Sequence, residues 1–505
     1  MAERRTEAGR VVLALDHGTT SARTLAIDAS GAVVAGCQEE TGLSFPQPGW
    51  VEQDPVKMWE AQLSTARGAL EKAGLSAADV AGIGITDQRE TTIVWDRATS
   101  EPVAPAIVWQ DRRTADFCEQ LRGAGCEALV RRKTGLLLDP YFSATKLRWL
   151  LDNVPGVRAR AERGELAFGT VDSWLAWKLS GGRRHVTDAS NASRTLLYDI
   201  REGAWDDELL ELFGVPLELL PDVCDSSGVC GETDAGVLGA PVPIAGIAGD
   251  QQAALFGQAC TSRGMVKVTY GTGCFLLLHL GDDPSAPPPG LVCTVALQRG
   301  GRRTYALEGS VFIGGAAVQW LRDGLKIVAT SPEADALAQS VPSSDGVVFV
   351  PALAGLGAPY WDPYARGGIF GLTRGSTGAH VARATLEGIA FQVADLYQAE
   401  VDGAGVTPPQ VRADGGAAAS DLLLQFQADL LGVPVTRAAQ PEATAFGAAW
   451  LAGLATGVWK DDDELAAQWA AGAVFEPRAE VDREAVRRPW RAAVAAVRGY
   501  AHDGQ

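Results

Sequence analysis

The residues best placed to do chemistry lie in the middle of the chain, between Pro243 and Gln258. Residues 243–248 alternate apolar and small side chains and predict a short buried strand, and residues 251–258 predict a helix. Asp250 therefore follows the carboxyl end of a strand, where open α/β sheets bind their ligands. Two interpretations stay open at this point. Asp250 is either a helix N-cap that stabilises its helix by ~1 kcal/mol or a general base at the junction of two halves.

A Gly/Thr-rich turn occurs once in each half of the chain. The first, at 17–21, follows the apolar strand 11–16 and opens a three-strand antiparallel meander. The second is Gly271-Thr272-Gly273, between strands at 265–270 and 274–280. Such turns present backbone N–H groups and hydroxyls to one concavity. Either turn alone is as consistent with a plain hairpin, but the duplication predicts two clamps on one polyphosphate.

A charged pair follows another predicted strand, at 80–86. Arg89 and Glu90 are neighbours, and neighbours on a regular strand face opposite ways, so they reach one ligand only from a strand end or turn. Together they offer charged donors and acceptors suited to the hydroxyls of a polyol. By spacing alone, two solvated surface charges are the favoured interpretation. Base rates likewise favour core positions for Trp109 and Tyr141.

Composition excludes several classes of function. The chain has 505 residues and a formal net charge of −18, which argues against nucleic acid or an anionic membrane as a partner. Its eight cysteines form no C-x-x-C, so we expect neither a metal site nor a disulfide framework, and a reducing cytoplasm fits best. No signal-like or membrane-spanning apolar run is present.

The remaining pattern predicts an α/β protein. Helices are expected at 55–73, 381–399, 420–431, 446–455 and 490–500, with strands at 347–351 and 411–413. The stretch 223–240, rich in Gly, Ser and Asp, predicts a loop, as does the proline-rich stretch 282–289.

Several of these segments together resemble the FGGY carbohydrate kinases. The matching stretches are D-H-G-T-T-S-A-R (16–23), T-D-Q-R-E-T-T (86–92), D-P-Y-F-S-A-T-K (139–146), G-I-A-G-D-Q-Q (246–252), T-Y-G-T-G-C-F (269–275), G-L-G-A-P-Y-W-D-P-Y-A-R-G (355–367) and A-D-G-G-A (413–417). The resemblance implies two actin-like (ribonuclease H-like) domains, at 9–254 and 255–505, with ATP and substrate in the cleft between them.

Within the family the chain looks most like the members that phosphorylate glycerol. The resemblance implies ATP and Mg²⁺ as cofactors and a homodimer or homotetramer, while the net charge argues against nucleic acid or membrane as a partner. Asp250 would be the catalytic base, and Asp16 and Asp250 would serve the metal ion. The residues implied for glycerol are Arg89, Glu90, Trp109, Tyr141, Asp250, Gln251 and Phe275. Those implied for the nucleotide are Thr19, Thr20, Ser21, Arg23, Thr272, Gly315, Gln319, Gly416 and Ser420.

The chain departs from the family pattern at three places. His17 stands where glutamine is usual, and Ser420 where an asparagine usually helps to hold the nucleotide, which puts that contact in doubt. Some bacterial members are inhibited by fructose 1,6-bisphosphate, bound by a glycine-rich loop and an arginine. Here the loop is 234–240 and Pro241 takes the arginine's place, so we expect insensitivity.

Two rival functions follow from the same residues. One keeps the enzyme class but makes the acceptor a pentulose or another polyol, against which Arg89, Glu90 and Phe275 argue through the family match. The other is an actin-like ATP-binding scaffold without a small-molecule acceptor. That function has no need for Asp250 together with Arg89, Glu90 and Tyr141, yet the chain has all four.

Overall fold

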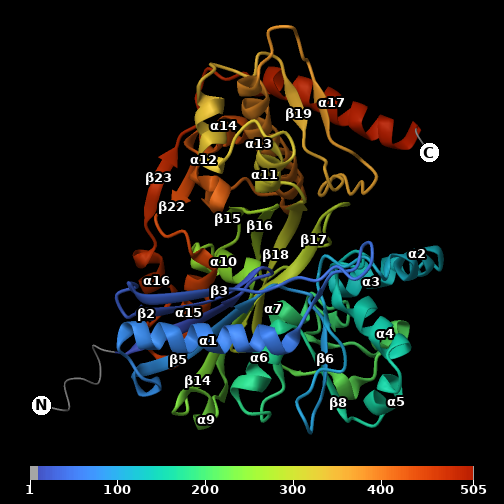
Figure 1. The fold of residues 1–505 in the computed structure, drawn as a ribbon, viewed down its shortest axis with the longest axis vertical. Coiled ribbons are helices and arrows are strands. Elements are labelled where there is room, and N and C mark those ends of the chain that lie inside the picture. The colour runs from blue at the N-terminus through green and yellow to red at the C-terminus, as the bar shows by residue number, and fades with distance from the viewer. Residues whose placement is uncertain (1–9, 504–505) are drawn as a thin grey trace, which may run out of the picture.

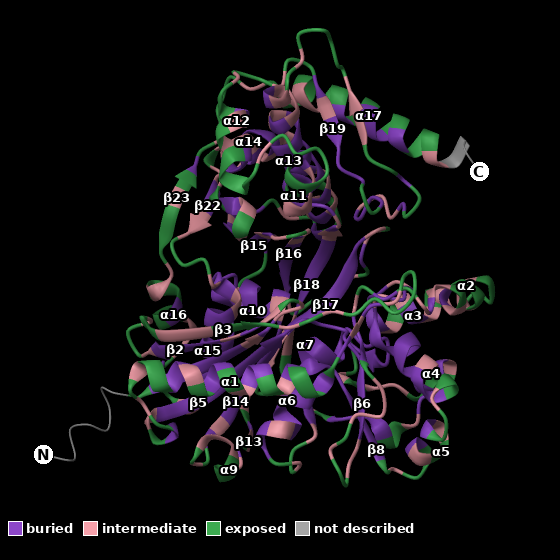
Figure 2. Cartoon of the chain, in the orientation of Figure 1, coloured by how far each residue is buried: buried purple, intermediate pink, exposed green. Residues whose placement is uncertain are grey.

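The computed structural model describes residues 10–503, which form two lobes stacked along the long axis of the molecule (Figure 1). Each lobe is built on one large twisted β-sheet. The central strands of both sheets and the helices beside them are largely buried, whereas edge strands and outer helices have exposed faces (Figure 2).

The sheet of the first lobe has six strands in the order β13-β14-β5-β1-β2-β3. Strands β14, β5 and β1 are parallel, and β1, β2 and β3 form the expected antiparallel meander. The bounds are β1 (Val11–His17), β2 (Ser21–Asp28), β3 (Val33–Glu40), β5 (Val80–Asp87), β13 (Ser227–Glu232) and β14 (Pro243–Gly249). Helices α1 (Pro55–Ala73) and α6 (Val171–Leu179) pack beside this sheet.

The sheet of the second lobe has seven strands in the order β17-β18-β16-β15-β21-β22-β23. Its bounds are β15 (Val266–Tyr270), β16 (Cys274–Gly281), β17 (Val292–Arg299), β18 (Arg302–Val311), β21 (Val411–Asp414), β22 (Val435–Ala438) and β23 (Ala471–Phe475). Like the first sheet, it joins an antiparallel meander to parallel strands and ends in an antiparallel edge strand. This repeated layout is the two-domain actin-like fold that the sequence predicts.

Helices and short strands complete both lobes. Beside the first sheet lies a smaller unit that contains β6 (Ile93–Asp96), β8 (Leu166–Gly169), α2 (Ala115–Gly123), α3 (Glu127–Thr134), α4 (Ser143–Asn153), α5 (Val157–Glu162) and α8 (Asp207–Phe213). The second lobe carries α11 (Gly315–Asp323), α12 (Ser331–Gln339), α13 (Gly378–Ala404), α14 (Asp421–Leu431) and α17 (Arg483–Asp503), with the short strands β19 (Val348–Val350) and β20 (Gly368–Phe370). No helix in residues 10–503 is both long and apolar enough to cross a bilayer.

One helix from the second half of the chain belongs by its packing to the first lobe. Helix α15 (Ala443–Thr456) packs on α10 (Asp250–Gly257) and on β14, β5 and β1 (Figure 1). A glycine on β5 allows this close approach, because a Cβ on Gly84 would lie 2.0 Å from the carbonyl oxygen of Ala448 in α15. The predicted domain boundary at residue 254 stays a prediction. The packing of α15 shows that a segment from the second half of the chain returns to the first lobe.

The predicted helices at 381–399 and 490–500 are longer in the structure, as α13 and α17, and one predicted loop is wrong. Residues 223–240 were expected to be a loop, but β12 (Asp222–Cys224), β13 and the short helix α9 (Ala235–Leu238) lie there. Strand β13 pairs with β14 and forms an edge of the sheet. An edge strand needs only one apolar side and tolerates Gly and Ser, so its composition resembles that of a loop.

Candidate active site

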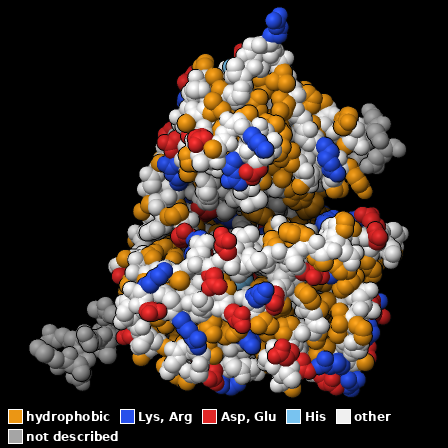
Figure 3. All heavy atoms as spheres, in the orientation of Figure 1, with side chains coloured by type: hydrophobic (Ala, Val, Ile, Leu, Met, Phe, Trp, Pro, Cys, Tyr) orange, Lys and Arg blue, Asp and Glu red, His pale blue; other side chains and the backbone are white. Residues whose placement is uncertain are grey.

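The candidate site lies where three parallel strands of the first sheet end. Asp16 is near the end of β1, Asp87 ends β5, and Asp250 follows β14 directly. Because β14, β5 and β1 are neighbours in the sheet, these three carboxylates lie together at the carboxyl ends of the strands. These strand ends face the second lobe, and the space-filling view shows a hollow between the lobes (Figure 3).

Asp250 is not the N-cap of its helix. Gly249 takes the N-cap position of α10, and Asp250 is the first helical residue. Its Oδ1 accepts the N–H of the adjacent Gln251 at 2.7 Å, and its side chain is 30% exposed. The capping interpretation therefore loses its geometric basis. A partly exposed carboxylate at the start of a helix, where the helix dipole favours negative charge, is free to meet a ligand.

Arg89 and Glu90 are buried, so they are not the solvated surface charges that spacing alone favours. Their relative exposures are 3% and 1%. Glu90 has φ 63°, a left-handed conformation that turns the chain after β5 and lets both side chains reach one region. The Nε atom of Arg89 lies 3.2 Å from Oδ1 of Asp250. The predicted acceptor residues Arg89, Glu90 and Asp250 are thus brought together.

Two further ions complete this buried group and were missed from the sequence. Glu308 of β18 accepts from Nη1 and Nη2 of Arg89 at 2.6 and 2.8 Å. Arg194 donates to the same carboxylate at 3.1 and 3.3 Å and to Glu90 at 2.6 Å. One signal for Glu308 was available: it is a lone charge in the otherwise apolar or small run 305–311. Arg194 lies in a polar stretch without such a contrast.

Aromatic side chains flank the same region. Trp109 and Tyr141 contact each other edge to face, with ring centroids 5.5 Å apart. Both are half-buried rather than core residues. The guanidinium of Arg194 lies 5.7 Å from the Tyr141 ring centroid, and burial raises the pKa of the Tyr141 hydroxyl. This pair therefore lies beside the ion cluster, as expected of walls around a small polar ligand.

Gln251 is held from the second lobe. Lys267, buried on β15, donates to Oε1 of Gln251 at 2.6 Å and to the hydroxyl of Thr269 at 2.9 Å. Burial lowers the pKa of Lys267. Phe275 on β16 pairs across the strands with Thr269 and is half-buried. The second lobe thus supplies Lys267 to the site, where it fixes the Gln251 side chain.

The first Gly/Thr turn is tight and connected to its surroundings. Gly18 donates its N–H to the carbonyl of Ser21 at 2.9 Å, and Gln53 donates to the carbonyl of Thr19 at 2.8 Å. The Thr20 side chain is exposed, whereas Arg23 on β2 forms an ion pair with Glu442 at the start of α15. The turn is therefore tied to its surroundings, with the Thr20 side chain exposed to a ligand.

The second turn packs on the start of a helix. Gly315 and Gly314, at the beginning of α11, donate to the carbonyls of Gly271 and Thr272, both at 2.8 Å. A Cβ on Gly315 would lie 2.9 Å from the Gly271 carbonyl oxygen, so glycine is needed there. Thr272 and Gln319 are exposed. Because these helix N–H groups are bound to the turn, an anion here would meet the N–H groups and the hydroxyl of the turn itself.

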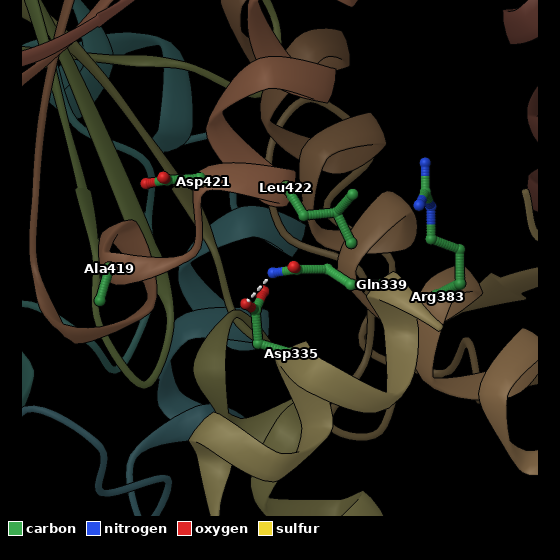
Figure 4. Close-up of a pocket in the computed structure, with 6 residues that line it drawn as sticks. All are labelled: Asp335, Gln339, Arg383, Ala419, Asp421 and Leu422. Carbon is green, nitrogen blue, oxygen red and sulfur yellow. Dashed lines mark hydrogen bonds between the residues drawn. The ribbon is translucent and has the colours of Figure 1, made fainter. Parts of the chain in front are cut away.

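Gly416 and Ser420 lie beside a pocket in the second lobe. Gly416 is exposed, and Ser420 is the N-cap of α14, accepting the N–H of Leu423 at 3.1 Å. The Ser420 hydroxyl also donates to Asp335. Asp335 lines a pocket of ≈530 Å³ together with Gln339, Arg383, Ala419, Asp421 and Leu422 (Figure 4). Because Ser420 is committed to its helix and to Asp335, it is a weak candidate for a direct nucleotide contact.

Asp16 and Asp250 are close enough to influence each other. Burial and the charge of Asp250 raise the pKa of Asp16 to about 6, although Arg23 opposes the shift. A divalent cation between two such carboxylates would relieve their repulsion. Among residues 10–503, no group of three His, Cys, Asp or Glu side chains is arranged to hold a metal ion. Two carboxylates nevertheless fit Mg²⁺, which keeps several waters and binds through one or two carboxylates and substrate phosphates.

His17 does not face this region. Its imidazole is buried, and Nδ1 lies 3.1 Å from Oε1 of Gln62 on α1. Burial lowers its pKa to about 4, against a smaller opposing effect of Gln62. Adjacent residues on a strand face opposite sides of the sheet. His17 points toward α1, so Asp16 points to the other side of the sheet. The departure at position 17 is thus a packing difference.

Comparison with known proteins agrees with this arrangement. Residues 11–257 match the N-terminal domain model of the FGGY family of carbohydrate kinases, and residues 266–456 match its C-terminal domain model. The chain belongs to the FGGY family. It is 57% identical to the glycerol kinase of Deinococcus radiodurans over 98% of this chain and 99% of that one.

Solved structures of FGGY kinases share the whole fold. The Plasmodium falciparum glycerol kinase with ADP superposes with a TM-score of 0.90 at 31% identity, covering 97% of this chain and 98% of that one. The Rhodospirillum rubrum xylulose kinase superposes with a TM-score of 0.85 at 26% identity, covering 98% and 100%. The fold is therefore common to kinases of different acceptors, so the fold alone does not identify the acceptor.

Proposed function

We propose that this protein transfers the γ-phosphoryl group of ATP to glycerol, giving sn-glycerol 3-phosphate and ADP. The observation that carries the proposal is the 57% identity to a glycerol kinase over nearly the full length of both chains. The geometry supports it, because Arg89, Glu90 and Asp250 converge where three parallel strands end. The reaction suits the catabolism of glycerol in the cytoplasm.

Recognition of glycerol would rest on buried charged groups with complementary roles. Arg89 supplies N–H donors, whereas Glu90 and Asp250 supply acceptors, so adjacent hydroxyls can each find a partner. Gln251 adds an amide whose oxygen is already held by Lys267, which leaves its N–H₂ group for the ligand. Trp109, Tyr141 and Phe275 would cover the carbon chain.

Asp250 would accept the proton of the terminal glycerol hydroxyl as that oxygen attacks the γ-phosphorus. The bond from the γ-phosphorus to the bridging oxygen breaks, and ADP leaves with the electron pair. Phosphoryl transfer depends mostly on positioning and on neutralising charge, and orienting the reactants contributes as much as ~7–11 kcal/mol. Arg89, 3.2 Å from Oδ1 of Asp250, would fix the direction of the base.

The nucleotide would lie between the two Gly/Thr turns. Thr19, Thr20 and Ser21 of the first turn and Thr272 of the second offer hydroxyls and N–H groups to the phosphates. Arg23, Gly315, Gln319 and Gly416 are the remaining proposed nucleotide residues, with Ser420 in a structural role behind them. When bound, Mg²⁺ would be held by Asp16 and Asp250 and would neutralise part of the negative charge of the phosphates.

A second candidate acceptor is another polyol or ketose, since xylulose kinases share the fold. An assay of ADP release separates the two. We expect fast turnover with glycerol, slower turnover with dihydroxyacetone, and little with xylulose or with no acceptor. Glycerol should also outperform 1,2-propanediol by as much as ~10⁴–10⁵ in kcat/KM, because the missing hydroxyl leaves buried polar groups unpaired. Equal turnover of glycerol and 1,2-propanediol would contradict the proposed acceptor site.

A further inference from the structure

The ion cluster at the candidate site joins the two lobes. Arg89, Glu90 and Arg194 come from the first lobe, whereas Glu308 lies in the middle of β18 in the second sheet. All four side chains are at most 3% exposed. The charges of two cations and two carboxylates neutralise each other, so this buried ion cluster is part of the folded structure rather than a chance surface contact.

Glu308 controls how the guanidinium of Arg89 is oriented. Its two oxygens take Nη1 and Nη2 of Arg89 in a forked contact at 2.6 and 2.8 Å, the geometry in which arginine binds carboxylate most specifically. Gln252 accepts a further hydrogen bond from Nη1 at 3.2 Å. With that edge of the guanidinium fixed, the edge that carries Nε faces Asp250 at 3.2 Å.

Glu308 itself is held in place and charged. Arg194 donates to both of its oxygens, at 3.1 and 3.3 Å, in addition to the forked contact with Arg89. Burial raises the pKa of the Glu308 carboxyl, but Arg194 and Arg89 outweigh this and lower it to about 2. Glu308 thus stays anionic over the whole working range of pH.

We infer that Glu308 is a positioning residue for the acceptor site: from the second lobe it orients Arg89, and through Arg89 it sets the direction of Asp250. The inference rests on the proposed function. Acceptor binding then depends on the two lobes being docked, because the residue that orients Arg89 comes from across the cleft. The turn residues at 18–21 and 271–273 share no hydrogen bond with Glu308, whose partners are Arg89 and Arg194, so its loss should affect the acceptor more than the nucleotide.

The test is a double-mutant cycle of Glu308→Gln and Arg89→Lys. Lysine keeps the charge of residue 89 but cannot make the forked contact. In the otherwise unchanged protein, Glu308→Gln should raise the KM for glycerol about tenfold or more while the KM for ATP stays within about twofold. In the Arg89→Lys background the same change should have a much smaller effect. Equal effects in both backgrounds, or equal effects on both substrates, would overturn the inference.

A second variant keeps the test decisive if Glu308→Gln does not fold. Glu308→Asp retains the buried charge but withdraws the carboxylate by one methylene, so it should raise the glycerol KM less than Glu308→Gln but still selectively. An unchanged glycerol KM in folded Glu308→Asp overturns the inference. The matched control is Asp462→Asn, which removes an exposed forked pair with Arg299 and should leave both KM values unchanged.

The unmodified protein is assayed first, which separates the two proposals. If it does not phosphorylate glycerol, the proposed function fails. If it does, and Glu308→Gln binds glycerol as well as the unmodified protein, only the positioning role fails.

Discussion

The indole N–H of Trp109 donates a 2.9 Å hydrogen bond to the hydroxyl of Thr19. Trp109 also packs edge to face on Tyr141. A proposed wall of the acceptor site is therefore tied directly to the first Gly/Thr turn, where the phosphates are proposed to bind. The two substrates would share a rigid boundary at the point where their reacting atoms meet.

Trp109→Phe tests this connection, because it removes the N–H donor and keeps an aromatic ring against Tyr141. A net hydrogen bond is worth ~1 kcal/mol, so we expect ADP binding to weaken about fivefold. Titration calorimetry with ADP measures it. Trp205→Phe is the matched control: its indole N–H donates to the Pro221 carbonyl at 2.9 Å, away from the proposed site. Unchanged ADP affinity in Trp109→Phe would show that the contact does not reach the nucleotide.

Asp250→Asn tests the proposed base. Asparagine keeps the shape and the N–H acceptor of the side chain but is a very poor proton acceptor, so kcat should fall by at least ~10²-fold. Nucleotide affinity should stay within a few-fold. Asp54→Asn, at the true N-cap of α1, is the control and should leave kcat unchanged because asparagine caps as well as aspartate. Near-normal kcat in Asp250→Asn would remove Asp250 from the chemistry.

The fold was readable from the sequence wherever local pattern and burial agree. The strand before Asp250, the helix after it and both Gly/Thr hairpins were predicted because alternation, glycine turns and helical spacing are local. The edge strand β13 was not, because only two of its six residues are buried and its composition matches a loop. The return of α15 to the first lobe could not be predicted either, since no local pattern says which sheet a small-residue helix covers.

The same distinction between local and long-range information applies to the residues of the site. Asp250 was placed by the strand–turn–helix pattern alone. The burial of Arg89 and Glu90 depends on compensation by Arg194 and Glu308, which lie 104 or more positions away along the chain. Spacing cannot reveal such partners, so two adjacent charges look like surface residues. The family resemblance supplied the role of Arg89 and Glu90, but only the three-dimensional structure shows what neutralises them.

His185 makes the stability of the first lobe sensitive to acid. Its Nε2–H donates to the Phe168 carbonyl at 2.8 Å, and Nδ1 accepts from Arg97 at 3.1 Å, so the ring is held neutral. Burial lowers its pKa to about 4, the Phe168 carbonyl opposes the shift, and Arg97 adds to it. The unfolded chain, with an ordinary histidine pKa of ~6.5, therefore binds more protons than the folded chain between these values.

Stability should accordingly fall as the pH drops from about 6.5 toward about 4, by about 2 kcal/mol at pH ~5 for this residue. Thermal unfolding followed across this range measures the effect. His185→Gln cannot titrate, so its Tm should fall less on acidification than that of the unmodified protein. His380→Gln, at an exposed capping position of α13, is the control. Parallel Tm curves for the unmodified protein and His185→Gln would contradict the assignment.

Insensitivity to fructose 1,6-bisphosphate is the last prediction. A bisphosphate needs backbone donors and fixed positive charge together. In the loop 234–240 the Asp234 carboxylate accepts the N–H of Gly236 at 2.8 Å, and Arg183 is paired with Asp234 at 2.5 Å. The Gly236 N–H and the Arg183 guanidinium are thus already bound to Asp234. Pro241 offers neither a charge nor an N–H group.

Glycerol phosphorylation should therefore be unchanged by millimolar fructose 1,6-bisphosphate, measured against sulfate at equal ionic strength. Asp234→Ala is the informative variant, because it frees both Arg183 and the Gly236 N–H. If the engaged donors are the reason for insensitivity, this variant should show weak anion binding where the unmodified protein shows none. Inhibition of the unmodified protein at sub-millimolar effector, lost when the loop is altered, would show that the loop binds the bisphosphate despite Pro241.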